Sequence, residues 1–225
     1  MTRTLLGVFA HPDDETFSIG ATLARLFSEG AHTALYVATD GAAGRASGVE
    51  VRNRSGLARL RRTEMLRAAA VLGVARVTMP GWPDGGLGEQ DEEAVVEGIV
   101  RMMRRVRPQT VVTFGPEGGP NQHRDHKAIS RAATTAFAHA ASGTWRPARL
   151  FYCTWSEQVA ERFGVAGLPA TCRLDVAEWM DLKRRAFEEH RTQWDHRERF
   201  EQTVNPLEEF ALAAGSPGAD DDLFG

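Results

Sequence analysis

The sequence predicts an α/β fold with a mostly parallel sheet covered by helices on both faces. Short apolar runs alternate with longer segments of helical periodicity along most of the 225 residues, a pattern typical of strand–helix–strand units. The first run, TLLGVFA (4–10), is apolar throughout, as expected for a strand buried on both faces. We therefore expect a ligand site beyond the carboxyl ends of the strands.

Five strands and five helices are expected in order along the chain. Continuous apolar or β-branched runs predict strands at residues 4–10, 33–39, 75–81, 110–116 and 148–155. Apolar residues that recur on one face predict helices at residues 21–30, 57–73, 91–108, 125–141 and about 175–190. The apolar faces of the first two helices would include Phe27 and Leu66. Residues 1–212 form one domain in this interpretation, and the small, polar, acidic segment 213–225 is expected to be disordered.

Composition excludes several classes of protein. The net charge is −3 and no basic stripe is present, which argues against a nucleic-acid partner. The two cysteines, Cys153 and Cys172, form no C-x-x-C pair, which excludes a disulfide framework and favours a reducing compartment. No segment approaches the roughly 20 apolar residues of a membrane helix. We expect a cytoplasmic protein without a membrane partner, and the sequence leaves the oligomeric state open, a homo-oligomer included.

Two histidine-containing motifs follow expected strands. The stretch FAHPDDE (9–15) comes directly after the first strand and HRDH (123–126) comes after the fourth. Proline and acidic residues suit the first turn of a helix, but a helix start does not explain His11, whose ring gains nothing from the positive end of a helix dipole. Each motif alone is compatible with an ordinary helix start. Together, at one edge of the sheet, they indicate a functional site.

The spacing within the two motifs suits a metal ion. His11 and Asp14 are three residues apart, as are His123 and His126, so each pair can point to one side. Two imidazoles and one carboxylate form a typical open zinc site, with a fourth position left for water whose pKa the metal lowers to about 7. Asp13 is the spare carboxylate that could accept the proton of that water.

These residues resemble the PIG-L/LmbE-like family of zinc-dependent N-acetyl-sugar deacetylases, which includes the mycothiol and bacillithiol biosynthetic deacetylases. The main motifs are AHPDDE (10–15) and HRDH (123–126). Weaker blocks follow the family's order over nearly the whole chain: ATDGAAGR (38–45), RRTEMLRAAAVLGV (61–74), PDGGL (83–87) and KRRAFEEHRTQ (183–193). The resemblance implies a Rossmann-like sheet with its active site at the carboxyl ends of the strands.

Carried over position by position, the resemblance implies that His11, Asp14 and His126 bind Zn²⁺. A site with two histidines and one carboxylate also accepts Fe²⁺. Asp13 would be the general base, and His123 would stabilise the oxyanion of the tetrahedral intermediate. Either of these two residues could return a proton to the leaving amine.

Three further roles follow from the same resemblance. Asp125 would hydrogen-bond His123 and fix its orientation. Arg61 would meet a polar or anionic part of the substrate, and Asp84 would bind a sugar hydroxyl. The chain departs from the family pattern at Ala42, where an acid is usual, and at Arg124, where proline is usual. Both departures lie in loops expected to face the substrate.

The leading hypothesis is a zinc-dependent hydrolase that removes an N-acetyl group from a GlcNAc-type sugar or glycoconjugate. One alternative keeps the fold and the metal but changes the amide, as in a thiol-conjugate amidase or a deacylase of a glycosylated natural product. The other is a non-catalytic metal-binding scaffold, against which Asp13 and His123 argue because holding a metal requires neither. A nucleotide-dependent dehydrogenase is disfavoured, because no G-x-G-x-x-G follows the first expected strand.

Overall fold

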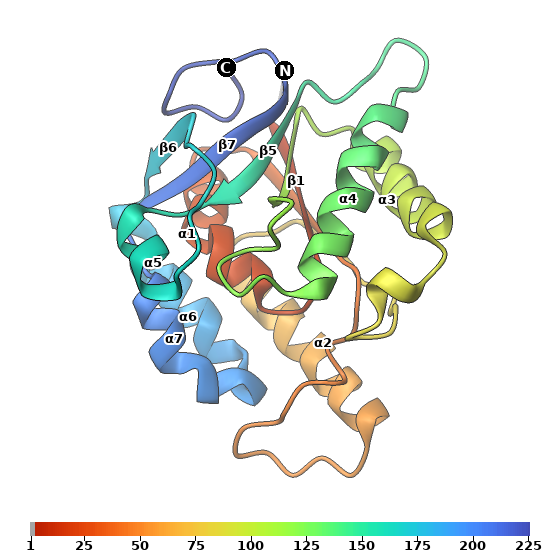
Figure 1. Cartoon of the computed structure of the whole chain (residues 1–225), viewed down its shortest axis with the longest axis vertical. Coiled ribbons are helices and arrows are strands. Elements are labelled where there is room, and N and C mark those ends of the chain that lie inside the picture. Colours follow the sequence, from red (N-terminus) through yellow and green to blue (C-terminus); the bar gives the residue numbers. More distant parts are fainter. Residues whose placement is uncertain (1–2) are drawn as a thin grey trace.

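The computed structural model describes residues 3–225, which are built around one seven-stranded sheet (Figure 1). The strand order is β3–β2–β1–β4–β5–β7–β6. Five parallel strands start within one residue of the expected ranges: β1 (Thr4–Phe9), β2 (His32–Val37), β3 (Arg76–Thr78), β4 (Thr110–Phe114) and β5 (Arg149–Thr154). The predicted α/β class with a mostly parallel sheet is confirmed.

Two further strands were not expected from the sequence. β7 (Leu207–Gly215) pairs antiparallel with β5, and β6 (Cys172–Asp175) pairs antiparallel with β7. The segment 213–225, for which composition favours disorder, follows a defined path: β7 continues to Gly215, and Leu223 is buried with its carbonyl oxygen accepting a 2.8 Å hydrogen bond from Thr110 Oγ1. Phe224 also packs against the core, and Arg149 donates to the carbonyl oxygens of Ser216 and Phe224.

Helices cover both faces of the sheet. α3 (Glu92–Val106) and α4 (Arg124–His139) pack together on one face. The other face carries α1 (Asp14–Ser28), α2 (Arg54–Val71) and α6 (Met180–Glu189). The short α5 (Glu157–Phe163), α7 (Arg197–Thr203) and the 3₁₀ turns 87–89, 177–179 and 191–196 complete the fold. Within residues 3–225, no helix is both long enough and apolar enough to cross a membrane.

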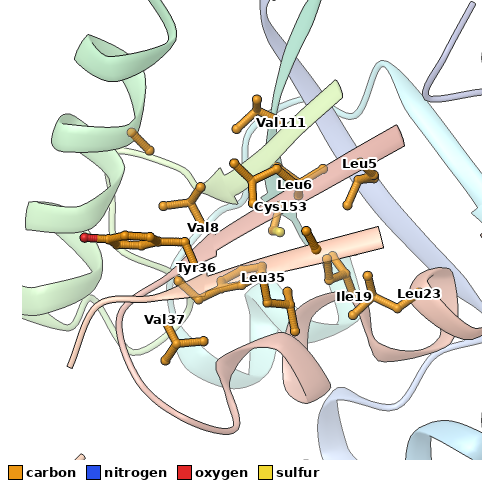
Figure 2. Close-up of a cluster of buried hydrophobic side chains, with 14 of the residues drawn as sticks. Leu5, Leu6, Val8, Ile19, Leu23, Leu35, Tyr36, Val37, Val111 and Cys153 are labelled. Carbon is orange, nitrogen blue, oxygen red and sulfur yellow. The ribbon is translucent and has the colours of Figure 1, made fainter. Parts of the chain in front are cut away.

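The core lies between the central strands and the helices that cover them. Figure 2 shows β1 and β2 side chains packed with Ile19 and Leu23 of α1 and with Val111 of β4, all of them buried. Burying each such side chain contributes about 1.5–3 kcal/mol. Two expected core residues are instead largely exposed, Phe27 at 59% and Leu66 at 49%. Phe27 lies in the last turn of α1, where its ring covers the backbone of Gly73 and turns its outer face to solvent.

The strand order places the two motifs together. From β1 the chain moves outward through β2 to β3 and then returns to form β4 on the other side of β1. Ligand sites of open α/β sheets lie at such a reversal, beyond the carboxyl ends of the strands. Because β1 and β4 are neighbours, the segments 10–15 and 123–126 meet at this edge, as predicted.

Candidate metal centre and active site

The turn after β1 points two carboxylates toward the strand ends. Asp13, the residue before α1, has φ 102° and ψ −26°, a left-handed conformation that is rare outside glycine and that asparagine and aspartate tolerate best. Asp14 folds back over β1, where its Oδ2 accepts hydrogen bonds from the backbone N–H groups of His11 (2.8 Å) and Ala10 (3.2 Å). The local backbone thus fixes the Asp14 carboxylate at the carboxyl end of the strand.

His11, Asp14 and His126 converge on one point. His11 Nδ1 lies 3.3 Å from His126 Nε2 and 3.4 Å from Asp14 Oδ2, and His126 Nε2 lies 3.1 Å from Asp14 Oδ1. A tetrahedral ion bound at about 2.0–2.1 Å by each ligand requires ligand atoms about 3.3 Å apart. All three side chains are buried, and their separations therefore fit a zinc-sized ion.

The outer nitrogens of both histidines face acceptors. His11 Nε2 lies 3.1 Å from Asp84 Oδ1 and 3.2 Å from Asp125 Oδ2, and His126 Nδ1 lies 3.1 Å from the carbonyl oxygen of Gly118. These acceptors favour a proton on the outer nitrogen of each ring, which leaves a lone pair on the inner nitrogen for a metal. The spatially adjacent group of His11, His123 and His126 also has the proximity of metal ligands.

The electrostatics of the cluster favour a cation at its centre. Burial opposes charge on Asp14, but His126 and His11 outweigh it and hold the pKa of Asp14 well below its usual range. Burial also opposes protonation of His11, yet Asp14, Asp125 and Asp84 raise the pKa of His11 well above its usual value. The cluster therefore favours a positive charge, and in the metal-free protein the proton on His11 supplies it.

Asp125 does not orient His123 through its side chain, contrary to the expectation from the sequence. Its carboxylate accepts hydrogen bonds from the backbone N–H groups of Gly85 (2.7 Å) and Leu87 (3.1 Å) and faces His11. Only the backbone N–H of Asp125 reaches His123, donating to Nδ1 at 3.2 Å. The reason is helical geometry, because side chains two residues apart at a helix start do not face each other.

Asp84 and Arg61 line the cavity but are already engaged with the protein. Asp84 Oδ2 accepts a 2.8 Å hydrogen bond from the backbone N–H of Ala43, and its other oxygen faces His11. Although burial opposes ionisation, these contacts lower the pKa of Asp84 to about 2. Arg61 is buried, donates to the carbonyl oxygens of Gly41 and Pro12, and places Nη2 3.4 Å from Asp13 Oδ1. Arg61 therefore contacts the expected base directly.

Asp13 and His123 have the environment of acid–base groups. Burial raises the pKa of Asp13 to about 6, with Arg61 acting in the opposite direction, so this carboxylate can exchange protons near neutrality. Burial and the neighbouring His11 and His126 lower the pKa of His123. Since His123 Nδ1 accepts from the backbone, its Nε2 carries the hydrogen and is free to donate it.

A buried pair of Glu15 and His190 lies behind the site. Glu15 Oε2 accepts a 3.0 Å hydrogen bond from the backbone N–H of Asp13, and Glu15 Oε1 lies 3.0 Å from His190 Nε2. Both side chains are fully buried. The resemblance to the family implies that His190, in the block 183–193, is a buried supporting residue and not a ligand; its partner Glu15, in the first motif, is not apparent from the sequence.

The cluster of His11, Asp14 and His126 opens into a cavity of about 410 Å³. This volume is within the usual range for small-molecule sites. His11, Asp13, Asp14, His123 and His126 line one end of it. Residues of α5, α7 and β7 line the other end, among them Phe163, Arg199 and Leu207. The cavity therefore extends well beyond the space next to the expected metal.

Comparison with known proteins shows consistent similarities. The model of the family PIG-L: GlcNAc-PI de-N-acetylase matches residues 6–137. A 1D-myo-inositol 2-acetamido-2-deoxy-α-D-glucopyranoside deacetylase of Thermobifida fusca is 31% identical over 85% of this chain and 83% of its own length. A probable N-acetyl-α-D-glucosaminyl L-malate deacetylase 2 of Bacillus cereus is 34% identical over 60% of this chain and 61% of its own. The solved structure of an N,N'-diacetylchitobiose deacetylase from Pyrococcus horikoshii in complex with an inhibitor shares the fold, with a TM-score of 0.75 and 20% identity over 96% of this chain and 84% of that one.

Proposed function

This chain belongs to the PIG-L: GlcNAc-PI de-N-acetylase family, and from that premise we propose that it is a zinc-dependent N-deacetylase of a GlcNAc-type sugar or glycoconjugate. The main support is the position of Asp13 next to the cluster of His11, Asp14 and His126. Three ligands are enough to hold a metal. A buried fourth group whose pKa is raised to about 6 is what hydrolysis requires in addition.

We assign His11, Asp14 and His126 to hold the ion, with Zn²⁺ as the leading candidate and Fe²⁺ compatible with the same ligand set. When bound, the metal supplies Lewis-acid chemistry, polarising a carbonyl and lowering the pKa of a water molecule to about 7. Asp84 and Asp125 hold His11 from behind, at 3.1 and 3.2 Å from Nε2. These outer carboxylates keep the inner nitrogen of His11 directed at the ion.

Asp13 acts as the base in this mechanism. It accepts a proton from the attacking water as the oxygen of that water bonds to the carbonyl carbon of the acetamide. It then gives that proton to the nitrogen of the sugar as the C–N bond breaks, leaving a free amine and acetic acid, which ionises to acetate. Arg61, 3.4 Å from Asp13 Oδ1, and the hydrogen bond from Asp13 N–H to Glu15 fix the carboxylate in position.

His123 acts on the carbonyl oxygen. Its Nδ1 accepts from the Asp125 backbone at 3.2 Å, so the Nε2 hydrogen is available to an oxyanion that develops as the carbonyl carbon becomes tetrahedral. A donor preorganised in this way contributes about 2.7–4 kcal/mol to transition-state stabilisation. The lowered pKa of His123 keeps the ring neutral at neutral pH, and a neutral donor is sufficient for this role.

A zinc amidase acting on a different amide is the second candidate, because the cavity of about 410 Å³ admits a larger substituent than the sugar alone. It uses the same metal, base and oxyanion donor and differs in the occupant of the cavity. The third candidate is a metal-binding scaffold without activity. Such a protein would have no role for a buried, ionisable Asp13. The two enzymatic candidates are therefore separated by substrate, and the third by turnover.

The test is a panel of N-acyl sugars scored for free amine and for acetate. The zinc-loaded protein should deacetylate at least one N-acetylglucosamine derivative, and Asp13→Asn should lower kcat by about 10²–10⁴-fold while retaining the metal. His126→Ala should lose the metal, whereas His139→Ala, at the exposed far end of the same helix, should keep both metal and activity. Unchanged turnover in Asp13→Asn, or an active metal-free enzyme, would contradict the mechanism.

A further inference from the structure

The cavity has an outer arm formed by Val159 and Phe163 of α5, Arg199 of α7, and Asn205 and Leu207 near the start of β7. Aromatic contacts connect this outer arm to the helix turn that carries Asp14. Phe17, one turn after Asp14, contacts Phe200 with ring centroids 5.3 Å apart, and Phe200 stacks on Phe187 at 4.2 Å. Because α7 packs against the turn of α1 that carries Asp14, the outer arm has a fixed position relative to the reacting end.

The carboxylates that line the cavity all face cationic or imidazole groups. In the outer part, Glu208 Oε1 lies 2.6 Å from Lys183 Nζ, and Glu209 Oε1 lies 2.8 Å from Arg173 Nε. At the reacting end, Asp13 faces Arg61, and Asp14 and Asp84 face the metal-site histidines. Within the part of the chain that the structure describes, no cavity-lining acid is left to neutralise a further cation.

Arg199 is such a further cation. Its guanidinium carbon lies 5.5 Å from the centroid of the Phe163 ring, and within residues 3–225 its guanidinium makes no hydrogen bond and no ion pair. Stacking on an aromatic face fixes the plane of a guanidinium and leaves its edge N–H groups free to donate. His196, three residues earlier, also lines the cavity. Burial and the nearby Arg199 and Arg61 lower the pKa of His196, while Asp195 acts in the opposite direction.

We propose that Arg199 binds an oxyanion of the substrate, a carboxylate or a phosphate carried by the group attached to the N-acetylated sugar. The inference rests on the proposed deacetylation and specifies its substrate class: glycoconjugates with an anionic aglycone. The planar fork of arginine matches either oxyanion with two parallel hydrogen bonds. The anion supplies the charge that the outer arm lacks, while the sugar amide occupies the end next to Asp13 and the metal ligands.

The experiment compares three glycosides of N-acetylglucosamine: the methyl glycoside as neutral probe, the carboxymethyl glycoside and the 2-phosphoethyl glycoside. We expect kcat/KM of the zinc-loaded protein to be about 10–100-fold higher for an anionic probe than for the neutral one, as for a hydrogen-bonded charge pair. Arg199→Met should remove this preference and leave the neutral probe unaffected. Arg197→Met, an exposed arginine of the same helix that does not line the cavity, is the matched control.

The two anionic probes distinguish a carboxylate from a phosphate source. Binding of all three probes to Asp13→Asn, measured by calorimetry, separates the present inference from the proposed reaction. If no probe is hydrolysed but the anionic probes bind more tightly and lose that advantage in Arg199→Met, the anion site stands and the reaction fails. Equal kcat/KM and equal affinity for neutral and anionic probes, or equal losses in Arg199→Met and Arg197→Met, would overturn the anion site.

Discussion

At the scale of single residues, Asp13 combines two unfavourable features. Its backbone has a left-handed φ of 102°, and its carboxylate is buried with a pKa raised to about 6. Strained backbone and desolvated charge both cost folding free energy and both persist at functional sites. Asp13 is therefore a residue at which activity and stability are opposed.

We predict that Asp13→Asn makes the metal-free protein more stable while abolishing activity. The folded-state pKa lies above the unfolded value, so the ionised carboxylate destabilises the fold above about pH 6 and has no such effect once both states are protonated. A shift of about two pKa units corresponds to about 3 kcal/mol, and we expect a gain of about 1–3 kcal/mol. Asparagine also tolerates left-handed φ.

Urea unfolding of the metal-free protein measures this gain at about pH 8, and the same measurement at about pH 4 should show it reduced. Asp91→Asn is a useful comparison, because Asp91 is an N-cap with an ordinary φ of −61° and its substitution should not stabilise the protein. An Asp13→Asn variant less stable than the parent at the higher pH would show that the contact with Arg61 outweighs the cost of burial.

At the scale of elements, α1 is divided by a break. Ile19 has φ −138° and ψ 20°, which interrupts the helical hydrogen bonds, and the backbone N–H groups of Ala21 (3.3 Å) and Thr22 (2.8 Å) donate to Glu208 of β7 instead. Glu208 is also paired with the buried Lys183 at 2.6 Å. The break lets the first turn of α1, with Asp14, take its own direction toward the metal cluster.

We predict that Glu208→Ala destabilises the protein by about 3–5 kcal/mol, because it leaves the buried Lys183 charge uncompensated. Adding Lys183→Met should recover part of the loss, since the two groups are in direct contact and their effects are not additive. Chemical denaturation measures both. Glu209→Ala is the matched control: its partner Arg173 is 54% exposed at the side chain, so the cation left behind stays hydrated and we expect a loss of about 0–1 kcal/mol. Equal losses at positions 208 and 209 would contradict this account.

The same elements show what the sequence could and could not predict. The five parallel strands and the helices between them were accessible because burial leaves a local pattern, and the meeting of the two histidine motifs because each motif is short and follows a strand. β7 was missed because its first residues include two glutamates, whose partners Lys183 and Arg173 lie 25 and 36 positions away. Arg199 was not among the expected site residues. An arginine in the charged stretch HRERFEQ (196–202) is expected to lie on the surface, and only the fold places it at the cavity.

The contacts of Asp125 and Asp84 depend on the direction in which each carboxylate points. The sequence alone does not give that direction. Both carboxylates turn toward His11, one from the start of α4 and one from the loop after β3. Sequence motifs therefore indicated which residues gather at this edge of the sheet, while the contacts between the motifs had to come from the fold.

At the scale of the whole molecule, the expected metal joins parts that the sheet separates. His11 lies just beyond the carboxyl end of β1, Asp14 begins α1 on one face, and His126 belongs to the first turn of α4 on the other face. An ion held by all three links the two layers at the reversal point of the sheet. It also replaces the proton that the raised pKa of His11 indicates in the metal-free state, so binding should be coupled to proton release and favoured as pH rises.

We therefore predict that removing zinc with a chelator lowers Tm and that one equivalent of zinc restores it. A ligand that binds only the folded state stabilises it by about 2.7 kcal/mol at a concentration of 100 times Kd, and for a chain of this size each kcal/mol shifts Tm by roughly 2–4 °C. The expected rise is about 5–10 °C, measured by calorimetry. His126→Ala should show no rise and His139→Ala the full one. A full rise in His126→Ala would mean that the ion binds elsewhere and that the two layers are not joined through this cluster.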